Sequence, residues 1–399
     1  MKVLVISHSC VVDVNQQVYV ELNRLNDVEV MLMIPAIWKS EYSGETIMPK
    51  ILTDVSFPVL KMPVVKPGHI SLHFYRQLPL TEIRAFRPDI ILSTQEPWSL
   101  SGLQAMYLSS ALGIPFVFQT NQNIEKRYPP PFGWIEAASF RRVAMALAYS
   151  EEARQVMLRK GLKQPSQVVP YATDTRLFQP ADTTALRQRL GLDGKTVIGY
   201  LGRLVPEKGV DTLLDALALL RDQRGIGKQV AVLLVGSGSA EESLKEQAKR
   251  LNLTEQVVFA GSVPHTEAAA YMACLDIFVL PSRTTPSWKE QFGRVIIEAL
   301  ACGVPVAGSD SGQIPHLIRE TGGGAVFPEG NAEALAEILA KWVENPDERK
   351  QLVQTGQHAV QERFTCEAVA FQLHQILKSR LASGTGKDPR DKIVNQSTA

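Results

Sequence analysis

The sequence predicts an α/β protein built from two doubly wound domains, each with a parallel sheet covered by helices on both faces. Its 399 residues exceed the ~250 to 300 at which a single hydrophobic core usually stops growing. Short, continuous apolar runs alternate with stretches long enough to hold crossover helices, which is typical of parallel sheets. The alternation restarts after a polar interval with three prolines, at residues 164–184, and this interval marks the domain linker.

The N-terminal domain is expected over residues 1–180. It opens with an apolar strand, Val3 to Ile6, followed by a polar loop and a helix expected over residues 15–25. Its further strands are expected at residues 28–34, 89–93, 115–118 and 144–149. Polar side chains that follow these strands should lie at one edge of the sheet, where ligands of such folds bind.

The C-terminal domain is expected over residues 181–360. Its strands are expected at 196–202, 229–235, 256–260, 277–280 and 305–307, with helices at 211–220 and 240–251. The region 332–381 reads as helical, and its last part, a helix over 361–382, is expected to pack back toward the N-terminal domain. Residues 383–399 are polar and poor in apolar side chains, so a disordered tail is predicted there.

Composition limits the partners and the location of the chain. Forty-two Lys and Arg against 41 Asp and Glu give a net charge of +1, so the sequence encodes no general attraction to nucleic acid, and no nucleic-acid partner is expected. The first apolar run has four residues, short of the ~7 to 15 of a signal-peptide core, and no window approaches the ~18 apolar residues of a membrane-spanning helix. Four cysteines, far apart and without CxxC spacing, indicate free thiols, and a cytoplasmic location is expected.

Two cations follow the first strand of the second domain. Arg203 and Lys208 lie in the segment Gly202–Gly209, between that strand and the helix expected near Asp211. The guanidinium offers a planar fork for phosphate oxygens and the ammonium a compact charge, while the glycines let the backbone approach a ligand closely. The segment therefore suits a diphosphate, although a turn with two surface cations and no ligand would have the same sequence pattern.

A second polar segment follows the strand at 277–280. If the next helix starts near Phe292, Glu298 lies about 9 Å along its axis and on the order of 10 Å from Glu290. The paired carboxyls of glycosidases lie ~5 Å or ~6.5 to 9.5 Å apart, so the spacing argues against glycoside hydrolysis by this pair. Carboxylates accept hydrogen bonds from sugar hydroxyls, and the N–H groups around Phe292 to Val295 can donate to a ligand. The alternative to a ligand site is that Glu290 interacts with the dipole of the helix N-terminus and that Glu298 has no related role.

Four segments in this order resemble retaining family 4 glycosyltransferases. They are G-R-L-x-x-E-K-G at 202–209, the E-x7-E pair Glu290 and Glu298, E-A-L-A-C-G-V-P-V at 298–306, and S-D-S-G at 309–312. The resemblance is strong over the C-terminal domain and loose over the N-terminal one. It implies the GT-B fold, in which two Rossmann-like domains with parallel sheets face each other across an interdomain cleft.

The resemblance also implies roles for individual residues. Arg203 and Lys208 would bind the donor diphosphate and offset charge as it leaves, and Glu290 would orient the donor sugar, so these three are the predicted catalytic residues. Glu298 would hold the ribose hydroxyls. The resemblance implies three further groups of donor-binding residues. Gly202 lies in the loop that would bind the diphosphate, Ser262 and Val263 would lie along the nucleobase, and Gln291, Phe292 and Gly293 with Val295 surround the start of the next helix.

The acceptor side departs from the family pattern. Many members have a glycine pair after the first strand, where this chain has His8, and a histidine near the reacting carbon, where it has Asn121. His8, Asn121 and Tyr128 are the predicted acceptor-side residues. The aromatic and proline-rich stretch from Tyr128 to Trp134 could stack on a sugar, meet a lipid surface or pack into a core. A weak peripheral association with the inner face of the membrane is therefore an expectation.

The predicted function is transfer of a sugar, with retention, from a nucleotide diphosphate sugar to a hydroxyl of a polysaccharide, oligosaccharide or glycolipid precursor. No cofactor and no metal are expected, because no cluster of His, Asp or Glu has metal-ligand spacing. A sugar-nucleotide 2-epimerase of the same fold and a non-catalytic relative that binds nucleotide sugars are the alternatives. A nicotinamide-dependent oxidoreductase is disfavoured because the first strand lacks GxGxxG.

Overall fold

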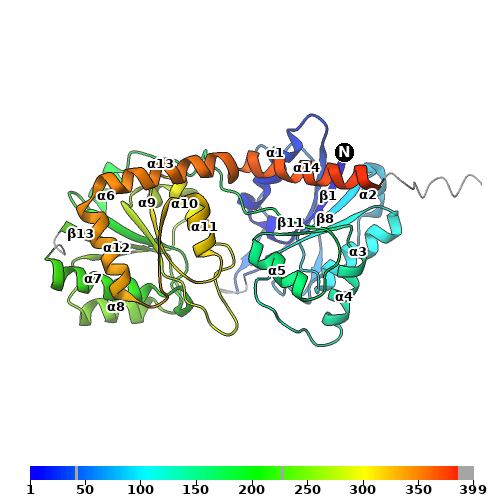
Figure 1. Cartoon of the computed structure of the whole chain (residues 1–399). Helices are drawn as coiled ribbons and strands as arrows, with labels where there is room; N and C mark the ends of the chain where they lie inside the picture. The colour runs from blue at the N-terminus through cyan, green and yellow to red at the C-terminus, as the bar shows by residue number, and fades with distance from the viewer. Residues whose placement is uncertain (41–43, 226–228, 385–399) are drawn as a thin grey trace, which may run out of the picture. The chain divides into compact units, whose positions relative to one another are not determined.

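The computed structural model describes residues 1–40, 44–225 and 229–384, which form two compact units (Figure 1). The first unit comprises Met1–Pro170 together with the chain from Cys366 onward, and the second comprises Tyr171–Thr365. The chain thus enters the second unit ten residues before the predicted boundary at 180. The reason is that residues 171–180 pack with the second unit: Phe178 is buried in its core, and the Thr173 N–H donates to the Phe364 carbonyl over 2.8 Å.

The first unit is built on a parallel sheet of seven strands in the order β11-β10-β9-β8-β1-β2-β5. These strands are β1 (Lys2–Ile6), β2 (Glu29–Pro35), β5 (Val59–Met62), β8 (Ile90–Ser93), β9 (Phe116–Thr120), β10 (Met145–Ala148) and β11 (Ser166–Val168). Two short antiparallel pairs accompany them: β3 (Trp38–Lys39) with β4 (Thr46–Ile47), and β6 (Val64–Val65) with β7 (Phe74–Tyr75). The helices are α1 (Gln17–Asn23), α2 (Leu80–Phe86), α3 (Leu100–Leu112), α4 (Phe132–Arg142), α5 (Glu151–Arg159) and α14 (Cys366–Gly384), with 3₁₀ turns η1 (Ser9–Val11) and η2 (Asp13–Gln16).

The C-terminal helix α14 completes the first unit. Figure 1 shows it beside α1, and three polar contacts fix it there. His374 Nε2 and Lys378 Nζ lie 2.9 and 2.8 Å from the two carboxylate oxygens of Asp27, and Arg380 Nε donates to the Ala144 carbonyl over 2.9 Å. The predicted tail at 383–399 lies outside the described residues, apart from the two that end α14.

The second unit has a parallel sheet of six strands in the order β14-β13-β12-β15-β16-β17. The strands are β12 (Thr196–Leu201), β13 (Val230–Val235), β14 (Val257–Gly261), β15 (Ile277–Leu280), β16 (Val306–Ser309) and β17 (Gly324–Phe327). The helices are α6 (Thr184–Arg189), α7 (Val210–Arg224), α8 (Glu241–Arg250), α9 (His265–Ala273), α10 (Arg294–Ala301), α11 (Ile314–Thr321), α12 (Ala332–Glu344) and α13 (Pro346–Arg363), with the 3₁₀ turn η3 (Pro206–Lys208). Its inner strands β13, β15 and β16 are buried along their whole length, and β13 and β15 accordingly read as unbroken apolar runs.

Within the two parallel sheets, the strands that the sequence did not predict lie at the edges. They are β5, β11 and β17, and each ends the strand order of its sheet. The short antiparallel pairs of the first unit were not predicted either. Edge strands are short and have one neighbour, so they need no continuous apolar run to be stable. Within the described ranges, no helix is both long enough and apolar enough to cross a membrane.

Candidate functional site

Two loops at the carboxyl end of the second sheet touch each other through their backbones. They follow the neighbouring strands β12 and β13, and the Gly202 N–H donates to the Val235 carbonyl over 2.9 Å. Gly236 has a φ of +136°, and a Cβ there would fall 1.9 Å from the Gly202 carbonyl oxygen. Only glycine allows this approach, so Gly236 fixes the start of the loop that carries Arg203 and Lys208.

Lys208 lies between a carboxylate and an indole ring. It ends η3, its Nζ donates to Glu290 Oε2 over 2.6 Å, and it lies 4.8 Å from the centroid of the Trp288 ring. Both Lys208 and Glu290 are largely buried, and ion pairs in such surroundings are screened little by salt. Two residues predicted from separate motifs, 82 positions apart, are therefore in direct contact. Arg203 is half-buried on the same loop, and the Tyr200 hydroxyl donates to its carbonyl over 2.8 Å.

The surroundings of Glu290 come from three segments of the chain. Its Oε2 also accepts a hydrogen bond of 2.9 Å from the Ser282 hydroxyl, which follows β15. Its carbonyl oxygen accepts from the Gln313 N–H over 3.1 Å, and a Cβ on Gly312 would lie 2.1 Å from that oxygen. The Ser282 carbonyl in turn accepts from the Ser309 hydroxyl over 2.6 Å. The S-D-S-G segment thus holds the backbone of Glu290 directly and its partner Ser282 through Ser309.

Helix α10 begins at Arg294, two residues later than the predicted start near Phe292. Gly293 has a φ of +78°, which is not a helical conformation, so the helix cannot include it. Glu298 is then four residues into the helix, or about 6 Å along its axis. It is buried at 7% exposure, and its Oε1 lies 3.1 Å from Arg294 Nε. Arg294 is a partner that the sequence reasoning missed, although its i,i+4 spacing from Glu298 was visible.

The side chain of Phe292 belongs to the core and leaves only its backbone for a ligand. Its ring lies 5.4 Å from Tyr171 and 6.5 Å from Phe364, measured between centroids. Gln291 and Val295 flank the start of α10 on either side.

The segment after β14 completes this edge of the sheet. The hydroxyl of Ser262 lies 2.6 Å from that of Ser237, which is in the loop after β13, and Val263 packs against the core. The predicted donor-binding residues therefore follow the carboxyl ends of parallel strands, the place where such sheets bind ligands.

In the first unit, His8 lies two residues after the end of β1, and its side chain is held by several contacts. Its Nδ1 donates to Gln95 Oε1 over 2.8 Å, and its ring lies 5.1 Å from Trp38 and 5.4 Å from His73. Burial lowers the pKa of His8 to about 4, with a further contribution from His73, so the imidazole is neutral near pH 7. A neutral ring with the proton on Nδ1 has a hydrogen-bond acceptor at Nε2.

Tyr128 is half-buried in the first unit, in contact with three other side chains. Its ring stacks on Trp98 at 4.5 Å, Lys160 Nζ lies 4.7 Å from its centroid, and its hydroxyl accepts from Gln122 Nε2 over 2.8 Å. Trp134, in contrast, is 70% exposed on α4. The aromatic stretch thus holds a half-buried residue, Tyr128, and a surface residue, Trp134.

Asn121 is held by a residue that the sequence reasoning overlooked. Its backbone N–H donates to Glu96 Oε1 over 3.3 Å, while the Thr120 hydroxyl donates to Oε2 of the same carboxylate. Burial raises the pKa of Glu96 to about 7. The sequence carries a signal for this role, since Gln95 and Glu96 are polar residues just after a buried strand, where ligands of parallel sheets bind.

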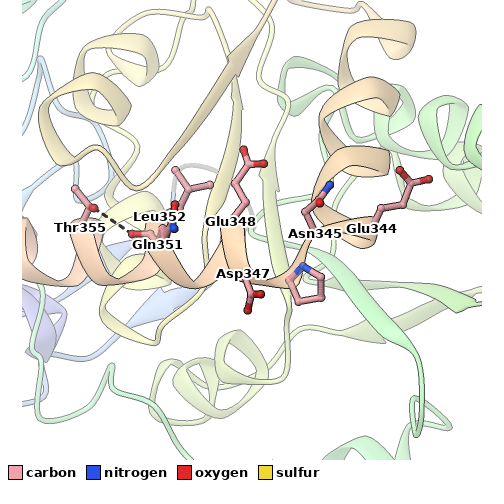
Figure 2. Close-up of a pocket in the computed structure, with 8 residues that line it drawn as sticks. Glu344, Asn345, Asp347, Glu348, Gln351, Leu352 and Thr355 are labelled. Carbon is pink, nitrogen blue, oxygen red and sulfur yellow. Dashed lines mark hydrogen bonds between the residues drawn. The ribbon is translucent and has the colours of Figure 1, made fainter.

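A hollow of about 690 Å³ lies away from these residues, at the junction of α12 and α13 (Figure 2). Figure 2 shows Asp347 and Glu348 pointing to different sides of the first turn of α13. Asp347 is paired with Lys350 and Glu348 with Lys341, each at 2.8 Å, and none of the predicted site residues lines the hollow. Among the described residues, no group of His, Cys, Asp and Glu is arranged to hold a metal ion.

Comparisons with known proteins identify the family. Residues 20–177 match Glycosyltransferase Family 4, and residues 182–359 match Glycosyl transferases group 1. The chain is 26% identical over 297 residues to an alpha-D-kanosaminyltransferase of Streptomyces kanamyceticus, which covers 70% of this chain and 75% of that protein. It is 32% identical over 216 residues to a GDP-mannose-dependent alpha-(1-6)-phosphatidylinositol monomannoside mannosyltransferase of Mycolicibacterium smegmatis. That match covers 53% of this chain and 56% of the relative, so the chain spans little more than half of the relative's length.

A solved structure of HepE from Anabaena, in complex with UDP and glucose, shares the fold. The TM-score is 0.71 at 21% identity, over 95% of this chain and 100% of that one. The predicted fold class, GT-B with two Rossmann-like domains, is confirmed, and so is the predicted class of function, glycosyl transfer. With one family match in each half, the chain belongs to the glycosyl transferases of group 1, family 4.

Proposed function

We propose that this protein transfers a hexose, with retention at the anomeric carbon, from a UDP or GDP sugar to a hydroxyl of a glycan or glycolipid precursor. The observation that carries the proposal is the contact between Lys208 and Glu290, beside Trp288 and Ser282, at the carboxyl end of a parallel sheet. A relative that uses GDP-mannose and a structural neighbour that binds UDP support this class of donor.

The cations bind the diphosphate. An ammonium has three N–H donors, and Lys208 directs one to Glu290, so two can reach phosphate oxygens. Arg203, on the same loop, adds a fork-shaped donor set. As the bond to the sugar breaks, negative charge grows on the leaving diphosphate, and fixed cations stabilise that charge in the transition state. They take the part that a metal ion has in other transferases, so we propose that the reaction is independent of metal.

The two glutamates hold different parts of the donor. Glu290 accepts from Lys208 and Ser282 and, because a carboxylate has about four acceptor positions, it can also receive sugar hydroxyls. The amides of residues 291–293 donate to the same sugar. Glu298, fixed by Arg294, accepts from the ribose hydroxyls, and Ser262 and Val263 lie along the base. The departing phosphate takes the proton of the acceptor hydroxyl, so the enzyme needs no base of its own.

The acceptor binds to the first unit, at the ends of β1 and β9. His8 offers Nε2 as an acceptor for a hydroxyl, and Asn121 supplies an amide side chain. Tyr128 contributes indirectly, because its hydroxyl accepts a hydrogen bond from the side chain of Gln122 and so holds that residue in place. The exposed Trp134 lies on the same helix as two arginines of the last turn of α4, and this combination favours weak binding to an anionic membrane surface on the cytoplasmic side.

A thermal-shift titration tests the donor site. Wild type is titrated with UDP, GDP, ADP and their sugar conjugates, without added metal, since a bound ligand raises the melting temperature by mass action. We expect a shift with one nucleotide, abolished in Glu298→Ala and retained in Glu344→Ala, a matched acid-to-alanine change at the hollow between α12 and α13. An equal shift in Glu298→Ala would remove Glu298 from the ribose site. Release of nucleotide from the preferred sugar conjugate then separates a transferase from a protein that only binds.

A further inference from the structure

The loop after β8 carries a carboxylate that organises the acceptor side. Strands β8 and β9 are neighbours, with Ser93 opposite Phe118, so their following loops lie together. Glu96 spans the two: its carboxylate accepts from the Thr120 hydroxyl and from the Asn121 N–H, the latter over 3.3 Å.

The contact continues along the turn. The Thr120 hydroxyl, which donates its hydrogen to Glu96, accepts from the Gln122 N–H over 3.2 Å. The Gln122 side chain then donates to the hydroxyl of Tyr128 over 2.8 Å. A single carboxylate therefore orders residues 120–122 and connects them to Tyr128. Hydrogen bonds to an ionised acceptor are about twice as strong as neutral ones, so the strength of this series of hydrogen bonds depends on the charge of Glu96.

Among the residues that the structure describes, two charged groups act on Glu96. Glu136 of α4 and Lys160 at the end of α5 face it, but they pair with each other at 2.5 Å, and Tyr128 lies under Lys160. Burial and Glu136 raise the pKa of Glu96, while Thr120, Asn121 and Lys160 lower it, and burial is the largest effect. The resulting value of about 7 places its ionisation in the working range of most enzymes.

Resting on the proposed function, we propose that Glu96 is a positioning residue of the acceptor site, which holds the turn at 120–122 firmly when ionised and loosely when protonated. The reacting groups are elsewhere, and Glu96 acts on them through Asn121. A substrate hydroxyl bound by this turn meets an ordered site above neutral pH and a mobile one below it. Transfer therefore gains acceptor affinity as the pH rises, with donor binding to the second unit unchanged.

The first test needs no substrate. The amide signals of Asn121 and Gln122 are followed by NMR in the full chain from pH 5 to 9. We expect both to shift in one step near pH 7 in wild type and in Glu125→Gln, an exposed acid of the same loop region, and to stay flat in Glu96→Gln. Thr120→Val, which removes a bond that lowers the pKa, should move the midpoint upward. Flat signals in wild type, or a step that persists in Glu96→Gln, would overturn the proposal.

The second test follows catalysis, with methyl α-mannoside or methyl α-glucoside as the acceptor and the nucleotide sugar selected by thermal shift. We expect the KM for the glycoside to fall about ten-fold as the pH rises through 7 in wild type, and to be raised and independent of pH in Glu96→Gln, with the KM for the donor unchanged. An unchanged KM in Glu96→Gln would refute the role in acceptor binding. Absence of turnover with every donor would refute the proposed function instead, and the NMR titration would still decide whether Glu96 holds the turn.

Discussion

Replacing Gly312 by alanine should damage catalysis by moving Glu290. Gly312 has a φ of +52°, and a Cβ there would lie 2.1 Å from the Glu290 carbonyl oxygen, where ordinary contact begins at 3.4 Å. The backbone of Glu290 must therefore retreat by about 1.3 Å, the difference between these distances. The carboxylate that holds Lys208 moves with it.

The magnitude follows from two effects. Misplacement of a catalytic group by about 1 Å can cost on the order of 10²-fold in rate. The left-handed backbone adds about 1 kcal/mol of strain for any residue with a Cβ, which lowers stability but not the rate directly. We expect kcat to fall about 100-fold in Gly312→Ala, with a small loss in melting temperature.

Gly303→Ala is the matched control. Gly303 has a φ of +79° in the same unit, but the atom nearest to its added Cβ is 3.5 Å away, so this change brings the strain without the displacement. Steady-state release of nucleotide from the preferred sugar conjugate gives kcat, and differential scanning fluorimetry gives the melting temperature. Equal kcat values for the two variants would refute the view that the S-D-S-G segment sets the position of Glu290.

Three further predictions concern other parts of the chain. Lys208→Ala should lower kcat by about 10² to 10³-fold and weaken nucleotide binding much less, because its second and third donors act most strongly on the charge that develops in the transition state; comparable losses in kcat and in nucleotide affinity would contradict this. Glu96→Gln should become more stable relative to wild type as the pH rises from 5 to 8. The carboxyl has a pKa of about 7 when folded and 4.5 as its ordinary value, so ionisation favours the unfolded chain across this window, by up to about 3 kcal/mol; urea unfolding at several pH values measures it, and a constant difference would refute it. Trp134→Ala should reduce sedimentation with anionic vesicles while leaving donor hydrolysis unchanged, and equal sedimentation of both proteins would exclude this residue from a membrane contact.

The sequence predicted the central strands of both sheets because these are buried on both faces and so must be apolar throughout. The strand at 277–280 was predicted at the residues where the structure has it. Edge strand β11, with the sequence Ser-Gln-Val, carries no such pattern, and the sequence predicts a linker at these residues. The predicted start of α10 is two residues early because the apolar pattern does not reveal that Gly293 takes a left-handed conformation, so that the helix begins only after it.

The site was predictable as a set of residues but not as a set of contacts. Motifs and their position after strands identified Lys208 and Glu290 separately, whereas their ion pair depends on how two distant loops meet. The stacking of Tyr128 on Trp98 and the pairing of Glu96 with Thr120 likewise come from tertiary packing. Glu96 lies outside the four motifs that resemble the family, so the sequence did not predict it.

The position of α14 in the chain has a consequence for synthesis on the ribosome. The second unit is continuous in sequence and can fold once Thr365 has emerged, whereas the first unit, begun at Met1, lacks its last helix until Gly384. At ~5 to 20 residues per second, the 214 residues from 170 to 384 delay that helix by on the order of 10 to 40 s. Throughout this interval the surface that later receives Leu373 and Leu377 is uncovered. The half of the protein that is made first is therefore completed last, and the exposed surface of α1 is where a chaperone would be needed.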